Sequence, residues 1–296
     1  MPNKTLLGMC LMIITTFLFS TMDGVSRFLA ETNSILSLVS FRYWFVSTFV
    51  MTYCLFVKNS FNKVIFTKQP MVQFSRGVIL SINNCIVIYS FTLIGLVETH
   101  AIIACYPLIV AGLSVPLLGE KFGWRRWSAI VFGFVGVIII LRPSIEIFSG
   151  GSIFALTGAI LFAIYLILTR HVSKEDSSIT SFFWMGLGGT ISMGFLSIFT
   201  WKNISQEYWL WVFIMCVLSA SSHFLMVKTL QIVQASIVQP FSFLQLVFAS
   251  IIGVIFFSES IDEMIFLGTS IVIGAGLFTF WREYKVERIK KYNNSH

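Results

Sequence analysis

The sequence predicts an all-α integral membrane protein whose ten transmembrane helices form two inverted five-helix repeats. Hydrophobic residues make up 56% of the chain and charged residues only 11%, whereas soluble domains carry roughly 25% charged residues. The apolar residues fall in unbroken runs of about twenty, the length at which a helix crosses a bilayer. A transmembrane β-barrel would instead show shorter segments of alternating polarity. A weak internal repeat, in which both halves share one layout, indicates the five-plus-five arrangement.

Ten apolar runs define the predicted helices in chain order, with short polar connections between most of them. The first five cover about 6–28, 36–57, 72–93, 97–118 and 125–141. The second five cover about 152–169, 179–200, 208–228, 235–257 and 264–281. The first run is longer than a signal-peptide core and lacks a small-residue cleavage site, so we expect it to remain in the mature chain.

The internal repeat is clearest between residues 89–143 and a fainter copy over 228–261. In each stretch an apolar run ends at a glutamate, and Glu120 and Glu259 are 139 residues apart (259 − 120). We expect both glutamates to mark helix ends with a structural role. The predicted divisions are a first repeat over 1–146, a second repeat over 147–284 and a basic tail over 285–296.

Flanking charges predict the orientation, because the cytoplasmic loops of membrane proteins carry an excess of Lys and Arg. An even number of helices puts both termini on one side. Cytoplasmic termini leave Arg27, Arg142 and Lys202 outside and Arg42 within a helix, so 16 of the 20 basic residues (20 − 4) lie on the cytoplasmic side. Five helices per repeat give the two repeats opposite orientations, the build by which many transporters reach outward-open and inward-open states.

Several short motifs carry a family resemblance. They are LLGEKF with Glu120, FFSES with Glu259, RRW followed by GFVG, Arg142-Pro143, SFRYWF with Arg42, and SRG with Arg76. Together with the ten-helix layout they make the chain similar to the EamA family of the drug/metabolite transporter superfamily along essentially its whole length. The resemblance implies a carrier in the inner (cytoplasmic) membrane of a bacterium.

A narrower resemblance rests on Arg76, Lys228 and the run QPFSFLQL. These features are similar to the bacterial EamA branch that includes S-adenosylmethionine uptake carriers of intracellular bacteria. That branch usually has an acidic residue where this chain has Gln245, and a tyrosine where it has Phe243. Both departures argue against a cationic substrate.

Polar residues at membrane depth are candidate substrate contacts, because burying them without a partner is costly. Asp23 lies one helical turn before Arg27, so an ion pair at the outer interface competes with a substrate contact. Arg42 could bind a substrate carboxylate or extend its guanidinium outward to the interface. Adjacent helical positions point about 100° apart, so of Asn83 and Asn84 we expect one to line the path and the other to bond a neighbouring helix.

Prolines near the middle of the predicted fourth and ninth helices mark a second group of candidates. Pro107 follows Tyr106 and frees a backbone carbonyl near Ile103, which predicts a kink or a substrate contact. Gln239 also precedes a proline, and Gln245 lies 139 residues after Tyr106 (245 − 106). Gln245, near the bilayer centre, is the first single residue that we expect to contact substrate.

Histidine, aromatic and glycine residues complete the candidates. His223 could carry a proton, since imidazole titrates near neutral pH, or could be a hydrogen-bonded packing residue. Tyr165 and Trp184 are candidate aromatic walls of a cavity. Glycines grouped on single helix faces allow close backbone approach, and those that end each repeat make a homodimer interface one hypothesis. These glycines are Gly133, Gly136, Gly186, Gly188, Gly189, Gly274 and Gly276.

The predicted function is a secondary transporter that moves a small polar or amphoteric metabolite, an amino acid or an S-adenosylmethionine-like molecule, by alternating access. A channel would require a ring of identical groups or a filter-like run. Because the sequence has no Walker motif, energy must come from gradients. The net charge of +7 fits orientation and contact with anionic lipid, so the expected partners are a small-molecule substrate and the lipid bilayer, with no nucleic acid.

The alternative function is an integral-membrane enzyme that acts on a lipid-linked substrate. Such an enzyme would need a nucleophile or metal motif at membrane depth, and the sequence contains no HExxH, no GxSxG and no Cys/His cluster. The five cysteines lie within apolar runs without CxxC spacing. We therefore predict no enzymatic activity, no cofactor and no metal site.

Overall fold

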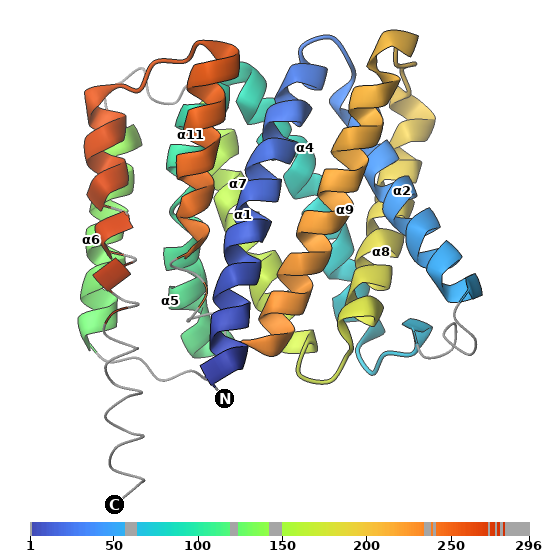
Figure 1. The fold of residues 1–296 in the computed structure, drawn as a ribbon, viewed down its shortest axis with the longest axis horizontal. Coiled ribbons are helices and arrows are strands. Elements are labelled where there is room, and N and C mark those ends of the chain that lie inside the picture. The colour runs from blue at the N-terminus through green and yellow to red at the C-terminus, as the bar shows by residue number, and fades with distance from the viewer. Residues whose placement is uncertain are drawn as a thin grey trace, which may run out of the picture.

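The computed structural model describes residues 2–56, 64–118, 124–141, 150–233, 238, 241–271, 273–275, 277–278 and 281. Within these ranges the regular structure is helical and contains no strand. The helices stand side by side in one bundle, with their ends at two opposite faces (Figure 1). The all-α prediction is confirmed for this part of the chain.

Most helices begin and end within a few residues of the predicted positions. In chain order they are α1 (Pro2–Ala30), α2 (Ile35–Phe56), α4 (Pro70–Ile103), α5 (Tyr106–Leu118), α6 (Trp124–Leu141), α7 (Gly150–Val172), α8 (Ser178–Thr200), the 3-10 turn η2 (Gln206–Tyr208), α9 (Trp209–Ile232) and α11 (Leu244–Phe257). Among the residues that the structure describes, six stretches are long and apolar enough to cross a membrane: Leu6–Ala30, Ile35–Thr52, Pro70–Val110, Gly150–Val172, Ser178–Thr200 and Gln206–Ile232. The chain is a multi-pass membrane protein, and the full number of ten helices stays a prediction.

Within α4 the chain turns sharply at Gly95, which divides this long element into two arms. Gly95 has a φ of 81° and a ψ of 175°, outside the helical region. The hydroxyls of Ser90 and Thr99 lie 3.0 Å apart, whereas nine residues of straight helix would separate them by about 13 Å. The turn separates the two predicted helices over 72–93 and 97–118, as expected.

The second arm of α4 is interrupted again before α5 begins. Ala104 and Cys105 form a turn between Ile103 and Tyr106. Pro107 has no N–H to donate to the carbonyl of Ile103, so the regular helix cannot continue there. The predicted break near Ile103 is confirmed.

A similar interruption precedes α11. Residues 241 and 242 are helical, Phe243 forms a turn and α11 begins at Leu244. Phe243 lies 139 residues after Ala104 (243 − 104), which is the spacing of the two glutamates in the sequence. Gln239, Glu120 and the basic tail lie outside the described residues, so the predictions made for them are unchanged.

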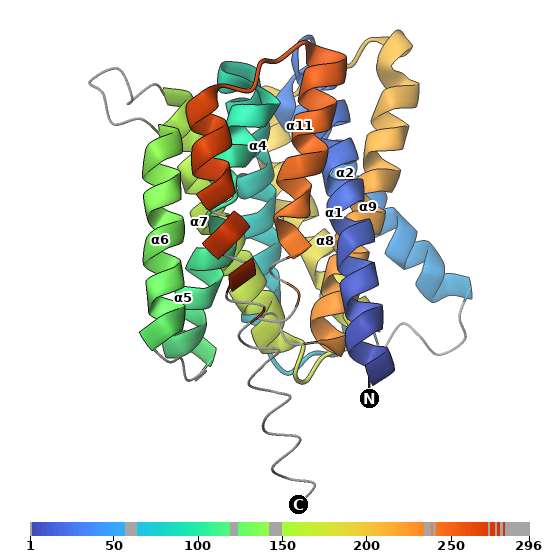
Figure 2. The same cartoon turned by 60° about the vertical axis from the view of Figure 1, so that its left-hand side comes forward.

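Close packing and paired hydroxyls hold the bundle together. α1 stands between α9 and α11 (Figure 1), while α4 packs against both α7 and α8. In Figure 2, α5 and α6 lie on the far side of the bundle from α2. Hydroxyl pairs join α8 to its neighbours and are typical of contacts between membrane helices. They are Ser40–Ser197 at 2.7 Å, Ser47–Thr190 at 2.8 Å and Ser81–Ser192 at 2.8 Å.

Two of the predicted glycine groups have visible packing roles. Gly188 meets Gly77 of α4 so closely that a Cβ on Gly188 would lie 2.6 Å from the Phe74 carbonyl oxygen. A Cβ on Gly133 of α6 would lie 2.1 Å from Leu108 of α5. Gly133 therefore packs within the chain, and the homodimer interface stays a prediction.

Candidate functional site

A cavity lies at the centre of the bundle, beside the two helix interruptions. Its wall comes from α1, α4, α5, α7, α9 and α11 and consists of Phe19, Met22, Asp23, Asn83, Asn84, Val87, His100, Ile103, Tyr106, Gly158, Phe162, His223 and Gln245. Six predicted site residues are among them: Asp23, Asn83, Asn84, Tyr106, His223 and Gln245. The volume of the cavity is about 40 Å³, which is room for a few water molecules.

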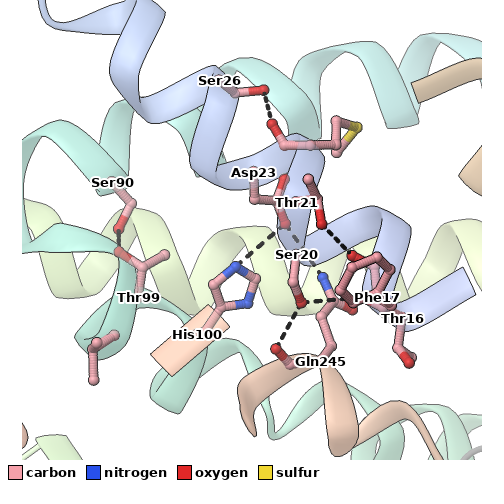
Figure 3. Close-up of polar contacts among 12 residues, drawn as sticks. Thr16, Phe17, Ser20, Thr21, Asp23, Ser26, Ser90, Thr99, His100 and Gln245 are labelled. Atoms are coloured by element: carbon pink, nitrogen blue, oxygen red, sulfur yellow. Dashed lines mark hydrogen bonds and ion pairs between the residues drawn. The ribbon is translucent and has the colours of Figure 1, made fainter. Parts of the chain in front are cut away.

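Asp23 is the carboxylate at this site. It is 7% exposed, and its Oδ2 lies 3.3 Å from the Nε2 of Gln245 and 3.3 Å from the Nε2 of His100. Figure 3 shows α1, α4 and α11 bringing these three side chains together. The hydroxyl of Ser20, one turn before Asp23, donates to the Gln245 carbonyl at 2.8 Å. The sequence therefore identified two members of this cluster, Asp23 and Gln245.

His100 was not predicted from the sequence. It is 3% exposed and its ring stacks on Phe91, with 5.4 Å between ring centroids. The available signal was an ionisable side chain within an apolar run, which in a membrane helix marks a candidate functional residue. His100 lies 77 positions after Asp23 in the chain (100 − 23). Their contact depends on how α1 and α4 pack, so no local sequence pattern predicts it.

Of the two alternatives for Asp23, the ion pair with Arg27 is wrong. Arg27 instead pairs with Glu259, which follows α11, and its guanidinium lies 4.1 Å from the centroid of the Phe257 ring. Glu259 also accepts hydrogen bonds from the backbone N–H groups of Leu96 at 2.8 Å and Val97 at 2.7 Å. These N–H groups begin the second arm of α4, where a helix leaves donors without backbone partners. The structural role predicted for Glu259 agrees with these contacts.

Asn83 and Asn84 both border the cavity, so the expectation that only one would do so is wrong. Their partners differ. Asn84 donates to the hydroxyl of Tyr43 at 2.8 Å, which is the predicted bond to a neighbouring helix. The Oδ1 of Asn83 is buried without a hydrogen-bond partner. Asn84 therefore borders the cavity and also bonds to α2.

His223 also borders the cavity with unused hydrogen-bonding capacity. Both ring nitrogens are buried without a partner, so the predicted hydrogen-bonded packing role is wrong. The ring meets Phe19 edge-on at 4.9 Å between centroids. Buried polar atoms normally find partners. The Asn83 oxygen and the His223 nitrogens are therefore atoms to which a bound molecule could bond.

The aromatic part of the wall differs from the prediction. Phe19, Phe162 and Tyr106 line the cavity, and Tyr106 meets Phe162 edge-on at 4.9 Å. Tyr165 lies one layer behind, fully buried and stacked on Phe162 at 5.9 Å. Trp184 donates to the Ile65 carbonyl at 3.0 Å and does not line the cavity. Sequence alone could not select among aromatic residues because 16% of the chain is aromatic.

Arg42 is only 1% exposed, so the alternative in which it extends outward to the interface is wrong. Its Nε donates to Ser219 Oγ at 3.0 Å and its Nη2 lies 3.0 Å from Met22 Sδ. Met22 lines the cavity, which places the guanidinium one side chain behind the wall. Within the described part of the chain Arg42 forms no ion pair.

Apolar membrane helices around a cavity that is lined by buried polar side chains and lies at helix interruptions are typical of a membrane transporter. A model of the EamA-like transporter family matches residues 6–142 and 149–281. The chain belongs to the EamA-like transporter family, so the predicted class of transporter is confirmed and the enzyme alternative is not supported.

Similar proteins agree with this class. The chain is 25% identical over 286 residues to an S-adenosylmethionine uptake transporter of Rickettsia prowazekii (strain Madrid E), covering 94% of both chains. It is 22% identical over 290 residues to a riboflavin transporter of Rhizobium johnstonii, covering 97% of this chain and 95% of the relative. A crystal structure with 12% identity superposes with a TM-score of 0.68 over 97% of this chain and 99% of its own, which shows a shared fold.

Proposed function

We propose that the chain is a secondary transporter that carries a small amphoteric metabolite across the bacterial inner membrane by alternating access between two inverted five-helix repeats. The observation that carries this proposal is the buried carboxylate of Asp23 in the wall of the central cavity. The family model matches the two halves of the chain separately, which supports the repeat. The two helix interruptions, at Ala104 and Phe243, support it as well, because they are separated by the same 139 residues as Glu120 and Glu259.

The charges around the cavity favour a molecule that carries both signs. Asp23 would pair with a cationic group of the substrate, an ammonium or a sulfonium. Arg42, buried behind Met22 without a carboxylate partner among the described residues, would receive a carboxylate. A buried charge without a partner is costly, so a substrate carboxylate that reached Arg42 would be favoured.

Gln245 stands where the similar EamA branch usually has an acidic residue, but its contact with Asp23 means that this difference does not argue against a cationic substrate. Gln245 touches Asp23, so the acidic group missing from α11 is supplied by α1 at the same point of the cavity. Phe19, Phe162 and Tyr106 add aromatic faces, which also attract cations. An S-adenosylmethionine-like molecule therefore fits the proposal, together with cationic amino acids.

The cavity volume requires movement of the helices during transport. The cavity volume of about 40 Å³ is far below the volume of a site that surrounds a small metabolite, which is typically about 300 Å³ or more. The described helices therefore close around the site more tightly than a bound metabolite allows. Interrupted helices are the elements that carry such binding sites in many transporters.

Counterflow in proteoliposomes tests the proposal. Vesicles loaded with unlabelled S-adenosylmethionine, riboflavin, lysine or methionine should take up the same labelled compound for at least one cationic or amphoteric member. Asp23→Asn should weaken binding of that compound by about tenfold to a hundredfold, because a charged hydrogen bond is lost. Thr21→Ala, on the same helix, removes only a bond to the Phe17 carbonyl and should leave uptake unchanged.

A second variant tests whether Arg42 binds a carboxylate of the substrate. Arg42→Lys should weaken binding of an amino acid more than binding of its methyl ester, because a bidentate contact needs the guanidinium fork. No counterflow for any compound by folded wild-type protein would overturn the proposal. Unchanged affinity in Asp23→Asn would remove Asp23 from the site.

A further inference from the structure

Two polar side chains in the cavity wall have hydrogen-bonding atoms without a partner among the described residues. The Oδ1 of Asn83 and both ring nitrogens of His223 are buried and unpaired, and the two residues are 4% and 3% exposed. Few such atoms occur in native structures, because a buried polar atom without a hydrogen bond costs free energy. Since both residues line the cavity, a molecule that enters the cavity can supply the missing hydrogen bonds.

A glycine on α7 keeps the space beside Asn83 open. A Cβ on Gly158 would lie 3.6 Å from the Oδ1 of Asn83 and 2.6 Å from the Cγ2 of Val87. Gly158 is itself part of the cavity wall. The absence of a side chain at Gly158 therefore leaves the unpaired amide oxygen open to a bound molecule.

His223 offers both a donor and an acceptor. The ion pairs of the described residues do not include His223, and a buried charge without a partner is costly, so the imidazole is neutral. A neutral imidazole donates from one ring nitrogen and accepts at the other. Together with the acceptor oxygen of Asn83, it suits a ligand that both donates and accepts hydrogen bonds.

Aromatic side chains pack around His223. Its ring meets Phe19 edge-on at 4.9 Å between centroids and Tyr165 edge-on at 6.4 Å. Phe162 meets Phe19 edge-on at 6.3 Å and lines the cavity beside it. Aromatic side chains stack on the face of any planar base, so this part of the wall also suits a planar ligand.

The aromatic part of the wall lies next to the carboxylate of the site. Phe19 is one helical turn before Asp23 on the same face of α1, and one turn advances by about 6 Å along the helix axis. Both residues line the cavity. A ligand that reaches both therefore carries a planar group a few bonds away from its cationic group.

Simple ions leave the unpaired atoms unused. An ammonium group only donates and a carboxylate only accepts, so neither pairs with Asn83 and with both nitrogens of His223. A nitrogen heterocycle with an amino or carbonyl group beside a ring nitrogen has donors and acceptors along one edge, as nucleic-acid bases do. The same ring has a flat face for the aromatic wall.

We propose that Asn83 and His223 bind the hydrogen-bonding edge of a planar nitrogen heterocycle whose face packs against Phe19 and Phe162. We call these four residues the ring subsite. This inference rests on the proposed function and narrows its substrate class to metabolites that contain such a ring. Asp23 holds a cationic group where the molecule has one, and the ring subsite selects among molecules that share that group.

Two matched pairs of compounds test the ring subsite. S-adenosylmethionine and S-methylmethionine share the sulfonium and the amino acid, and only the first has a purine; riboflavin and ribitol differ by the heterocycle. Ligand-dependent thermal unfolding of the purified protein in detergent measures each affinity. In at least one pair the ring compound should bind about tenfold or more tightly, because its partner cannot stack. Equal affinities within both pairs, or no binding by any of the four compounds, would overturn the ring subsite.

Variants of His223 separate recognition of the ring from packing. His223→Phe keeps a ring of similar size without its nitrogens, so binding of the ring compound should weaken by about threefold to tenfold for each lost bond. Binding of its ring-free partner should be unchanged. His223→Gln keeps a donor and an acceptor and should restore part of the affinity. His171→Phe, at an exposed histidine in the last turn of α7, is the control and should bind both compounds like wild type.

A second position makes the test independent of how one variant folds. Asn83→Leu removes the other unpaired atom in a side chain of similar size and should also weaken only the ring compound. Asp23→Asn should instead weaken S-adenosylmethionine and S-methylmethionine alike, since both carry the sulfonium. Equal weakening of the ring compound and its ring-free partner by the folded His223→Phe and Asn83→Leu variants, or no weakening, would overturn the assignment of these residues.

The two proposals fail in distinguishable ways. Counterflow of lysine or S-methylmethionine, without any preference for a ring compound, overturns the ring subsite and leaves the proposed function standing. Ring-dependent binding that His223→Phe weakens, without counterflow of any compound by folded protein, overturns the proposed function and leaves the ring subsite as a binding site.

Discussion

The two faces of the bundle are held by different kinds of contact. The connection that follows α11 lies at one face, and the connection between α7 and α8 lies at the other, with the N-terminus (Figure 1). At the first face the Glu259 carboxylate holds Arg27 of α1 and the N–H groups of Leu96 and Val97 in α4. We call these residues the Glu259 cluster. It joins three elements that surround the cavity.

At the opposite face an Asp176 network joins α4, α7 and α8. Asp176 accepts from Thr67 at 2.5 Å and from Gln73 at 2.7 Å, and Gln73 also donates to Ser181 at 3.1 Å. Arg76 donates to the Ser181 carbonyl and, at 3.0 Å, to a hydroxyl on α7. Movement of α1 or α11 away from α4 breaks the Glu259 cluster, but leaves the Asp176 network intact. For the proposed alternating access, we therefore expect α4, α7 and α8 to move together and the Glu259 cluster to open and close.

The largest expected loss of stability comes from the Asp176 network. Arg76→Ala should lower the free energy of unfolding by about 3 kcal/mol or more, because Arg76 is fully buried and its removal leaves a cavity and unpaired acceptors. Thermal unfolding in detergent measures the change. Lys68→Ala is the control, since its pair with Glu175 at 3.8 Å is exposed and contributes about 0–1 kcal/mol. Equal effects of the two variants would contradict a structural role for the network.

Glu259→Gln should cost less stability, about 2 kcal/mol, because it removes a charged acceptor from the beginning of a helix and leaves Arg27 without its partner. Its effect on the transport rate should exceed that of Arg76→Ala among folded molecules. Glu207→Gln, in the exposed turn η2, is the matched control. If Glu259→Gln transports like wild type, the cluster is not the part that opens.

Gly95→Ala should cost about 1–2 kcal/mol for the positive φ alone, and more because its Cβ would lie 2.6 Å from Glu259 Oε1. Gly194→Ala is a control for which we expect the opposite change in stability, a gain. Nothing lies within 4 Å of a Cβ at Gly194 in α8, so alanine there should stabilise by about 0.5–1 kcal/mol. A Gly95→Ala variant as stable as wild type would show that the turn tolerates another backbone conformation.

The smallest effect is expected at the hydroxyl pair between α4 and α8. Ser192→Ala removes the 2.8 Å contact with Ser81, and such bonds contribute about 0.6 kcal/mol on average between membrane helices. Unfolding measurements on Ser81→Ala, Ser192→Ala and the double variant isolate the pair. Strictly additive losses would mean that the two hydroxyls contribute independently.

Much of the fold follows from the sequence because hydropathy and backbone chemistry are local. Apolar runs about twenty residues long predict spanning helices, and the ends of α1, α2, α7 and α8 agree with them. Pro107 predicts the interruption before α5, since a proline removes a specific helical hydrogen bond. Of the site, Asp23 and Gln245 could be selected because polar groups at membrane depth need partners or a cavity.

Tertiary structure decided which polar groups meet. Asp23 pairs with His100 and Arg27 with Glu259, whereas the spacing on α1 left open an ion pair between Asp23 and Arg27 or a substrate contact of Asp23. Arg42 is buried rather than extended outward because Ser219 and Met22 receive its donors. The sequence by itself determined where helices run and which of their residues are costly to bury. Partners for those residues come from helices distant in the chain, and only the packing of the helices brings them within bonding distance.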